Sequence, residues 1–385
     1  MKKNILAVAV AGALVAPMAM ADAEVYGTAH VSFGQLDNTG TNGDTLTVLP
    51  NNSNIGFKGS EDLGGGLKAE YQAETALTWD TGGWGGGRDT FVGFAGDWGQ
   101  ARVGRANTPF KNATAALDPF GDTVADYNGV MGVGANGEDN DTRLSNALWY
   151  NSPNMSGFSG SVMYGTNDAR DINSVSGRER SEISVGGTFK SGPFFVGAGY
   201  QQMAEGGNLI AGTGAAADTT NNYDDMSAWR VGGSYTLMEN TTLGLAYEQV
   251  DSGKATGGGG SALERNGIFA SLTHKIGATT LALSYSMADE VDNYKDTGAD
   301  MFALGAMHAL SKNTTVYAMY TQLTVGDGLA DNDGDGVETA GTVDQLNLST
   351  SYGLSSATFA PNRTGSGDYE AKGLVVGVIH KFSSK

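Results

Sequence analysis

The chain has 385 residues, a formal net charge of −19 at pH 7 and no cysteine. Nucleic-acid binding depends on Lys and Arg that neutralise phosphates, so this acidic balance argues against a nucleic-acid partner. A disulfide framework is excluded, while 59 glycines against 7 prolines indicate many tight turns and closely packed strands.

The N-terminus has the parts of a secretory signal peptide. Two lysines precede an apolar run from Ile5 to Met20, which ends in small residues. We predict a signal peptide over residues 1–21, with cleavage after Ala23 as the alternative, and one domain over residues 22–385. No later segment reaches the roughly 18 uninterrupted apolar residues of a membrane helix. The exported chain is therefore either soluble or a membrane barrel, which also satisfies its own backbone.

The connections between the expected strands are sorted by length. Seven short ones, rich in turn formers, begin at Gly59, Gly96, Asn151, Lys190, Leu237, Lys275 and Leu310. Eight longer polar or acidic stretches lie near residues 37–52, 80–88, 108–141, 167–180, 204–226, 251–265, 289–300 and 324–370. The segments between them predict fifteen strands, and residues 371–382 predict a sixteenth. An even number places both ends of the barrel chain on the short-turn side, as in bacterial outer-membrane barrels.

Alternation within the segments indicates a wet interior. Between Gly66 and Leu77, apolar residues and threonine occupy one face, and Lys68, Glu70, Gln72 and Glu74 occupy the other. Charges at every second position need water on their face, so Glu70 and Glu74 are expected in a lumen wall. The terminal segment alternates in the same way and ends on Phe382, an aromatic suited to a membrane interface.

Three of the four histidines precede short turns. His274, His308 and His380 are predicted to belong to an interfacial girdle at the short-turn rim, and His30 is expected to face the lumen. No Ser or Asp stands beside the three to complete a catalytic constellation. No catalytic residue is therefore predicted.

A family resemblance rests on four runs of sequence. The runs Asn54–Glu74, Arg88–Phe110, Asp118–Asp122 and Val376–Phe382 resemble those of the Gram-negative general-diffusion porins. The resemblance implies an all-β fold: a transmembrane antiparallel β-barrel of 16 strands in the bacterial outer membrane, with an inward-folded third loop. It also implies a homotrimer, for which the loop at residues 82–87, with Trp79 and Trp84, is a candidate contact.

The same resemblance assigns the pore constriction. It implies that Arg105 projects into the constriction, that Arg143 belongs to the same basic wall, and that the third loop supplies an acidic side. Strand alternation separately places Arg102 on the lumen face. The predicted set is Arg102, Arg105, Arg143, Asp118, Asp122 and Asp126. Asn54 stands where many members have an arginine, which predicts a thinner basic wall. The tail Ser383-Ser384-Lys385 is a second departure, because members usually end at the phenylalanine.

An acidic run in the last long stretch resembles the first half of a calcium loop. Asp331, Asp333 and Asp335 occupy positions 1, 3 and 5, with glycine at position 6. Position 12 is Thr342 instead of a bidentate glutamate. The run predicts at most a weak calcium site or a bridge to anionic lipopolysaccharide, and an acidic solvated loop tip is the alternative. No other cofactor is expected.

These features predict a channel for passive diffusion of small hydrophilic solutes and ions. The acidic residues of the loops outnumber the arginines of the predicted constriction, so a mild cation preference is expected. The alternative is an outer-membrane adhesin or receptor barrel, which the long loops would also suit but which leaves the opposed charges unexplained. An outer-membrane enzyme would need a rim constellation that the sequence lacks. Conductance in a planar bilayer separates the channel from the other two.

Overall fold

The computed structural model describes residues 23–38, 45–133, 140–167, 180–203, 226–252, 264–291, 297–326 and 369–384. The predicted signal peptide and the calcium candidate Asp331, Asp333 and Asp335 lie outside these residues. Among the described residues, no helix is both long and apolar enough to cross a membrane.

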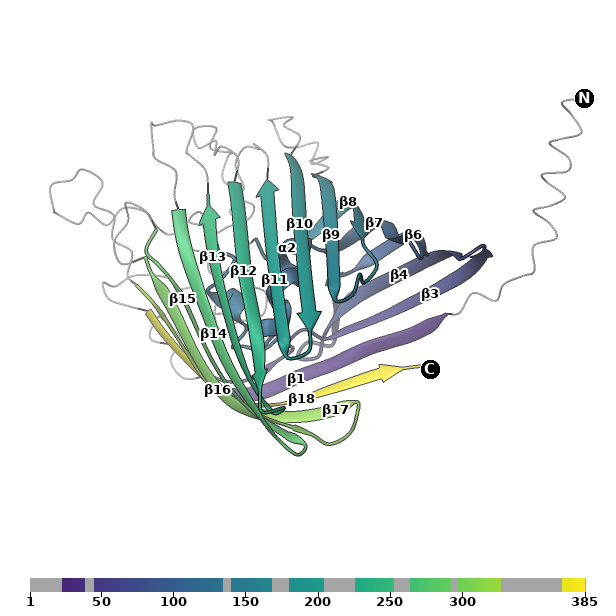
Figure 1. The fold of residues 1–385 in the computed structure, drawn as a ribbon. Helices are drawn as coiled ribbons and strands as arrows, with labels where there is room; N and C mark the ends of the chain where they lie inside the picture. Colours follow the sequence, from purple (N-terminus) through teal and green to yellow (C-terminus); the bar gives the residue numbers. More distant parts are fainter. Residues whose placement is uncertain are drawn as a thin grey trace, which may run out of the picture.

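Antiparallel strands form most of the described chain and close into one barrel (Figure 1). β1 pairs with β18 at the closure, over Tyr26–Asn38. The strands are β1(Glu24–Asn38), β2(Thr45–Leu49), β3(Asn54–Gly64), β4(Leu67–Thr78), β5(Gly83–Gly87), β6(Thr90–Gly96), β7(Gly99–Asn107), β8(Arg143–Asn151), β9(Phe158–Asn167), β10(Arg180–Ser191), β11(Phe194–Met203), β12(Met226–Leu237), β13(Thr241–Asp251), β14(Glu264–Ile276), β15(Thr279–Ala288), β16(Ala299–Ala309), β17(Thr314–Val325) and β18(Tyr369–Ser383). Between β7 and β8 lie α2(Pro109–Thr114) and the 3₁₀ turns η1(Ala115–Leu117) and η2(Tyr127–Gly129).

Two spanning strands are interrupted. β2 and β3 pair with different halves of β1, and β5 and β6 pair with different halves of β4. Each couple is therefore one strand with a break, and the eighteen segments make sixteen spanning strands, which confirms the predicted number. The loops predicted at 37–52 and 80–88 were too long, because each contains strand residues, in β2 and β5 respectively.

The two faces of the wall differ in chemistry. Large apolar side chains alternate along the outward face and remain exposed, for example Val196 (47%), Leu245 (63%) and Leu374 (62%). A contiguous exposed apolar surface of this kind suits lipid and not water. The inward face carries glycine, serine and charged residues, and His30 lies there, buried, with its Nε2 3.0 Å from the Tyr317 hydroxyl.

The three other histidines share one local geometry. Each lies near the short-turn end of its strand, with Nδ1 hydrogen-bonded to the threonine directly opposite on the preceding strand. The pairs are His274 with Thr241 at 2.8 Å, His308 with Thr279 at 2.9 Å and His380 with Thr314 at 3.0 Å. Their place agrees with the predicted girdle, whose contact with a membrane surface stays a prediction.

The segment after β7 packs against the wall at β10 and β11. Pro109 starts α2, and the Thr108 side chain caps it by accepting from the Lys111 amide. Glycines of β10 and β11 make room, because a Cβ at Gly197 would overlap the Ala113 carbonyl oxygen. Further along, the Ser271 hydroxyl of β14 donates to the Leu117 carbonyl at 2.8 Å.

The apolar core lies between this segment and the wall. Phe120 is fully buried in a cluster with Ala303, Tyr317 and Met319 of β16 and β17. A second cluster joins Leu117, Tyr127 and Met131 to Phe269 of β14. Interior packing of this kind is worth about 25 cal/mol per Å² of apolar surface removed from water. The segment is thus held by a core of its own on the side away from the exposed apolar band.

Candidate functional site

The break between β5 and β6 is the centre of a charged network on the inward face. Arg88 and Asp89 occupy this break, and only 8% of Arg88 is exposed. The Arg88 guanidinium forms an ion pair with Glu74 of β4 and donates to the side-chain oxygen of Asn52, in the break between β2 and β3. The Ser53 carbonyl accepts from the Leu77 amide at 3.0 Å, which ties this break to β4 as well.

A chain of contacts connects this pair to the packed segment. The side-chain amide of Asn52 donates to the carboxylate of Asp122. The backbone of Asp122 is left-handed, with a φ of 64°. At the other end of the chain of contacts, the Tyr26 hydroxyl of β1 donates to the Glu74 carboxylate at 2.9 Å. The network therefore runs from Asp122 on the segment through Asn52 and Arg88 to Glu74 and Tyr26 on the wall.

Two predicted arginines reach the same break from β7 and β8. Arg143 forms an ion pair with Asp89 at 2.8 Å. Arg105 donates to the Gly87 carbonyl at 3.1 Å and to the Ser145 hydroxyl at 2.6 Å. A register shift between β7 and β8 accompanies these contacts, and Gly104 has a φ of 145° there. Arg105, Arg143 and Asp122 are thus linked through Gly87–Asp89.

Arg102 forms a separate pair nearer the short-turn end. Its guanidinium binds Glu70 through two nitrogens, at 2.6 and 3.2 Å, and lies 4.3 Å from the centre of the Phe91 ring. A planar guanidinium held by both a carboxylate and a ring has a fixed orientation. Arg102 and Glu70 therefore occupy the inward face as alternation predicts, one step away from the Arg88 network.

Asp126 is buried inside the segment and Asp118 is half-buried, and both hold its turns. Asp118 accepts from the Phe120 and Tyr127 amides at 2.8 and 2.9 Å, and Asp126 accepts from the Asn128 and Asp122 amides at 2.9 and 2.7 Å. Burial raises the pKa of Asp126 to about 6, and burial with the nearby Asp126 charge raises the pKa of Asp118 well above its usual value. These carboxylates are structural, and Asp118 adds less negative charge at neutral pH than its sequence suggests.

The raised pKa values predict that acid stabilises the segment. Both groups bind protons more readily when folded than when exposed, so stability rises as the pH falls from 7 to 5, through the Asp126 pKa. Each group adds at most about 1.4 kcal/mol per pH unit. Protection factors of amides 118–128, which are normalised for the intrinsic pH dependence of exchange, should rise from pH 7 to pH 5 in the wild type, and Asp126→Asn should remove most of this rise. Lower protection factors at pH 5 than at pH 7 would contradict the prediction.

Sequence reasoning missed the strongest attachment of the segment to the wall. Arg230 of β12 is fully buried, pairs with both Asp141 and Glu248, and donates to the Tyr127 hydroxyl at 2.9 Å. Glu248 also accepts from the Gly132 amide at 2.6 Å. The available signal was register, because Arg230 and Glu248 stand directly opposite one another on neighbouring strands.

Arg88, Asp89 and Asn52 were also missed as site residues. A strand interruption breaks the alternation by which a residue is assigned to one face of the wall. The Arg-Asp pair that follows the glycine run Gly85–Gly87 was the available signal of such an interruption. The structure joins Arg105, Arg143, Asp122 and Glu74 into this network and leaves Arg102 with Glu70 apart. Asp118 and Asp126 instead bind backbone amides within the segment.

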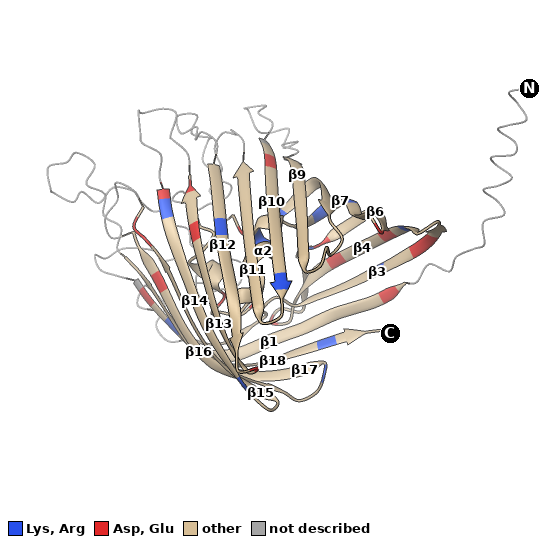
Figure 2. Cartoon of the chain, in the orientation of Figure 1, with Lys and Arg blue, Asp and Glu red and all other residues tan. Residues whose placement is uncertain are grey.

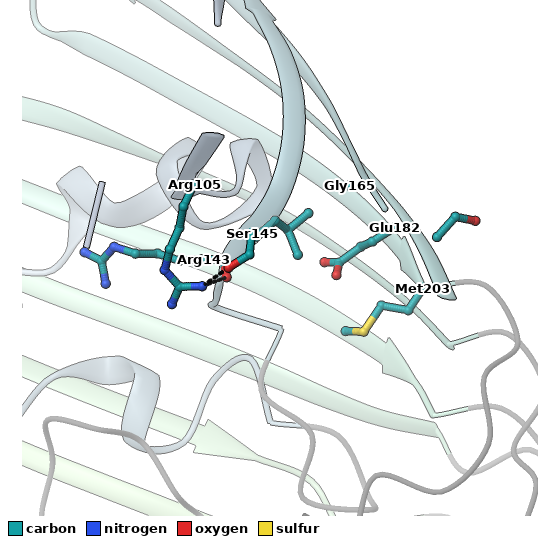
Figure 3. A pocket seen from close by; sticks show the side chains of 8 residues that line it. Arg105, Arg143, Ser145, Gly165, Glu182 and Met203 are labelled. Carbon is teal, nitrogen blue, oxygen red and sulfur yellow. Dashed lines mark hydrogen bonds between the residues drawn. The ribbon is translucent and has the colours of Figure 1, made fainter. Parts of the chain in front are cut away.

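A polar cavity adjoins the network where β8 separates from β9 (Figure 3). β9 pairs with β8 only up to the Ala147–Gly165 pair, and the register shift carries Leu144 to β7. The resulting space measures about 220 Å³, with Arg105, Arg143 and Ser145 on one side and Glu182 and Met203 on the other. Basic and acidic side chains therefore line a space that is large enough for water molecules. The described residues contain no metal-ligating cluster.

Comparisons with known proteins agree on one family. A family model described as Gram-negative porin matches residues 6–328. The major outer membrane protein P.IB of Neisseria meningitidis serogroup B (strain ATCC BAA-335 / MC58) is 31% identical, covering 85% of this chain and 95% of the relative. Outer membrane porin protein 32 of Delftia acidovorans is 28% identical, covering 82% of this chain and 88% of the relative.

Solved structures with the same fold include two outer-membrane proteins. The anion-selective porin from Comamonas acidovorans matches with a TM-score of 0.69 at 20% identity, over 94% of this chain and all of that one. The in-vitro folded OmpT of Vibrio cholerae, in its trimer form, matches with a TM-score of 0.63 at 16% identity, over 94% and 99%. At these identities the likeness concerns the barrel fold alone.

Proposed function

Since this chain belongs to the Gram-negative porin family, and is thus an outer-membrane channel protein, we propose that small hydrophilic solutes and ions diffuse passively through its lumen. The observation that carries the proposal is the network around Gly87–Asp89, in which arginines of β7, β8 and the β5–β6 break meet carboxylates of the wall and segment on the inward face. We propose further that residues 108–141 lie inside the barrel and narrow this lumen, which the packing of Phe120 and α2 on the inward face supports.

Opposed charges would make this narrow zone a filter. Acidic and basic residues are interspersed along the strands of the wall (Figure 2). The basic groups of Arg88 and Arg143 and the carboxylates of Glu74 and Asp122 would create a field beside the path. Low-dielectric walls strengthen such a field relative to bulk water. Polar solutes that align with it keep favourable interactions while they pass, whereas apolar solutes must displace ordered water.

We propose a mild cation preference that weakens as salt rises. Arg88, Arg102 and Arg143 are each paired with one carboxylate, so these pairs nearly cancel. Asp122, beside the neutral Asn52, and Arg105, which donates to Gly87 and Ser145, offset one another, so the sign is decided by the −19 of the chain as a whole. Exposed loop charges act over a Debye length of roughly 10 Å at 0.1 M salt, whereas charges in a narrow zone are screened less.

Single-channel recording in a planar bilayer tests the channel function. Purified protein should insert with discrete, ohmic conductance steps, and a polar solute that enters the lumen should reduce the current in proportion to its size. A folded barrel that inserts without any conductance would refute passive diffusion. Such a barrel would favour the adhesin or receptor alternative.

Neutralising Asp122 is expected to move the selectivity toward anions. A unit charge about 10 Å away in water is worth about 0.4 kcal/mol, or roughly a twofold change in the permeability ratio. Asp122→Asn should shift the reversal potential in a tenfold KCl gradient by that much, and Arg105→Ala should shift it toward cations. Asp62→Asn, at the exposed β3–β4 turn, is the matched control. Clear anion preference of the wild type would overturn the proposed cation preference.

The assembled protein is proposed to be a homotrimer in contact with membrane lipid and lipopolysaccharide. Trp79 and Trp84 are 50% and 73% exposed beside and within β5, which supports a contact between neighbouring subunits there. Native mass spectrometry in mild detergent should show trimers, and monomers alone would refute the assembly. A weak calcium site at Asp331, Asp333 and Asp335 stays a prediction, tested by calcium titration of the folded protein.

A further inference from the structure

The polar cavity beside β8 has opposite charges on its two sides. Arg105 and Ser145 lie on one side, and Glu182 and Met203 lie on the other (Figure 3). Its volume is about 220 Å³. At roughly 30 Å³ per water, this space holds about seven waters or one small organic molecule. Glu182 is not one of the residues of the charged network, so the cavity brings in a carboxylate that the proposed filter does not use.

Strand register fixes the acidic side of the cavity. Gly165, Glu182 and Met203 form one paired row across β9, β10 and β11. The next residue of β10, Ile183, is 39% exposed on the outward face, so alternation directs the Glu182 row inward. β8 pairs with β9 only up to the Ala147–Gly165 pair, and Gly165 has no side chain. The space between the Glu182 carboxylate and β8 therefore stays open.

Neutral acceptors orient the basic side. The Nε of Arg105 donates to the Gly87 carbonyl at 3.1 Å, and its Nη1 donates to the Ser145 hydroxyl at 2.6 Å. These two contacts hold the guanidinium without cancelling its charge. A guanidinium has five N–H donors in a planar fork and can bind a carboxylate through two of them. Leu144 and Met203 add apolar surface to the lining.

We propose that this cavity binds a small zwitterionic amino acid that enters from the lumen. The Arg105 guanidinium donates to the carboxylate of the solute, and the ammonium of the solute donates to the Glu182 carboxylate. Leu144 and Met203 contact its apolar body. A simple anion meets a like charge at Glu182, a simple cation meets one at Arg105, and a neutral sugar gains from neither. The inference rests on the proposed diffusion function for the entry of the solute, and it adds a solute class to that function.

Three probes of similar size test the two charges separately in the wild type. L-Alanine is compared with L-lactate, which lacks the ammonium, and with L-alaninamide, which lacks the carboxylate. Saturation-transfer NMR titrations of the folded protein in detergent measure the binding. Alanine should bind at least about fivefold more tightly than either analogue, because it alone makes both charge-assisted contacts. Equal binding of alanine and lactate would overturn the proposal. So would the absence of saturable binding, since the cavity would then hold water only.

Removing the acidic side should change the selectivity of the cavity. Glu182→Gln keeps the shape of the side chain and leaves only the basic side charged, so the preference for alanine over lactate should disappear. Glu264→Gln is the matched control, because Glu264 is a half-buried carboxylate of β14 that accepts from Gln249 at 3.0 Å and lies outside the cavity lining. An unchanged preference in Glu182→Gln, or an equal loss in Glu264→Gln, would refute the assigned ammonium contact.

Binding in detergent does not depend on conductance, which separates this site from the channel. Discrete conductance steps without selective alanine binding would remove the site and leave passive diffusion in place. Selective alanine binding by a barrel that inserts without conductance would refute passive diffusion, and with it the entry of the solute from the lumen, but not the binding.

Discussion

Arg230→Met is expected to loosen the segment 108–133 from the wall at a cost of about 3–5 kcal/mol, since removing one partner of a buried ion pair leaves uncompensated charge. Here two carboxylates, of Asp141 and Glu248, would lose the guanidinium they share, and the Tyr127 hydroxyl would lose a donor. Hydrogen exchange of the segment should accelerate by at least a hundredfold. Single-channel records should show larger and noisier currents if the segment narrows the lumen.

Two variants test whether the buried charge is the cause. Arg265→Met is the matched control: Arg265 is a buried arginine of β14 whose terminal nitrogens have no hydrogen-bond partner among the described residues, so its loss should cost much less. Adding Asp141→Asn and Glu248→Gln to Arg230→Met removes the unpaired charges and should restore part of the protection. Equal exchange in Arg230→Met and the wild type would show that the apolar core alone fixes the segment.

Arg88→Gln should give the largest change in selectivity of any single pore substitution. It removes a charge, leaves the Glu74 carboxylate without its ion-pair partner and breaks the link through Asn52 to Asp122. The net change is one charge, as at Asp122, but it arises at a nearly buried position where the effective dielectric is low. The cation-to-anion permeability ratio should therefore rise several-fold, beyond the roughly twofold change at Asp122. Reversal potentials in a tenfold KCl gradient measure it.

The control for this variant is Arg102→Gln. Arg102 has its own carboxylate partner, Glu70, but lies outside the network that reaches the segment. Its substitution should change the permeability ratio less than Arg88→Gln. An equal or larger effect of Arg102→Gln would place the narrow zone at the Glu70 pair.

The sorting of short and long connections was sufficient to predict the sixteen strands, and period-two alternation agreed, because one face meets apolar surroundings and the other meets polar ones. Alternation failed at β5, whose run of glycines and one tryptophan offers little of it, and at β2, which Pro50 separates from β3. These segments are recognised as strands only through their pairing with β4 and β1. Such pairing depends on the closed barrel and is absent from any local pattern.

The candidate site was predictable to the extent that its residues obey the same alternation. Glu70, Glu74 and Arg102 do so, and the structure places all three on the inward face. Arg88 sits in a strand break, where the direction of a side chain is set by tertiary contacts. Asp118 and Asp126 have the composition of an acidic wall, but backbone amides of their own segment take up both carboxylates.

With the segment inside the barrel as proposed, the apolar core that it forms with one side of the wall makes the barrel interior asymmetric. Phe110, Phe120 and Met131 are fully buried against strands from β10 onward, whereas the Arg88 network lies on β3 to β8. On the proposed function, the aqueous path is therefore eccentric, displaced from the barrel axis toward the charged arc. Because Asp122 already contacts Asn52 of that arc, the open width is the gap between segment and arc beside this contact, and a larger barrel circumference alone would not admit larger solutes.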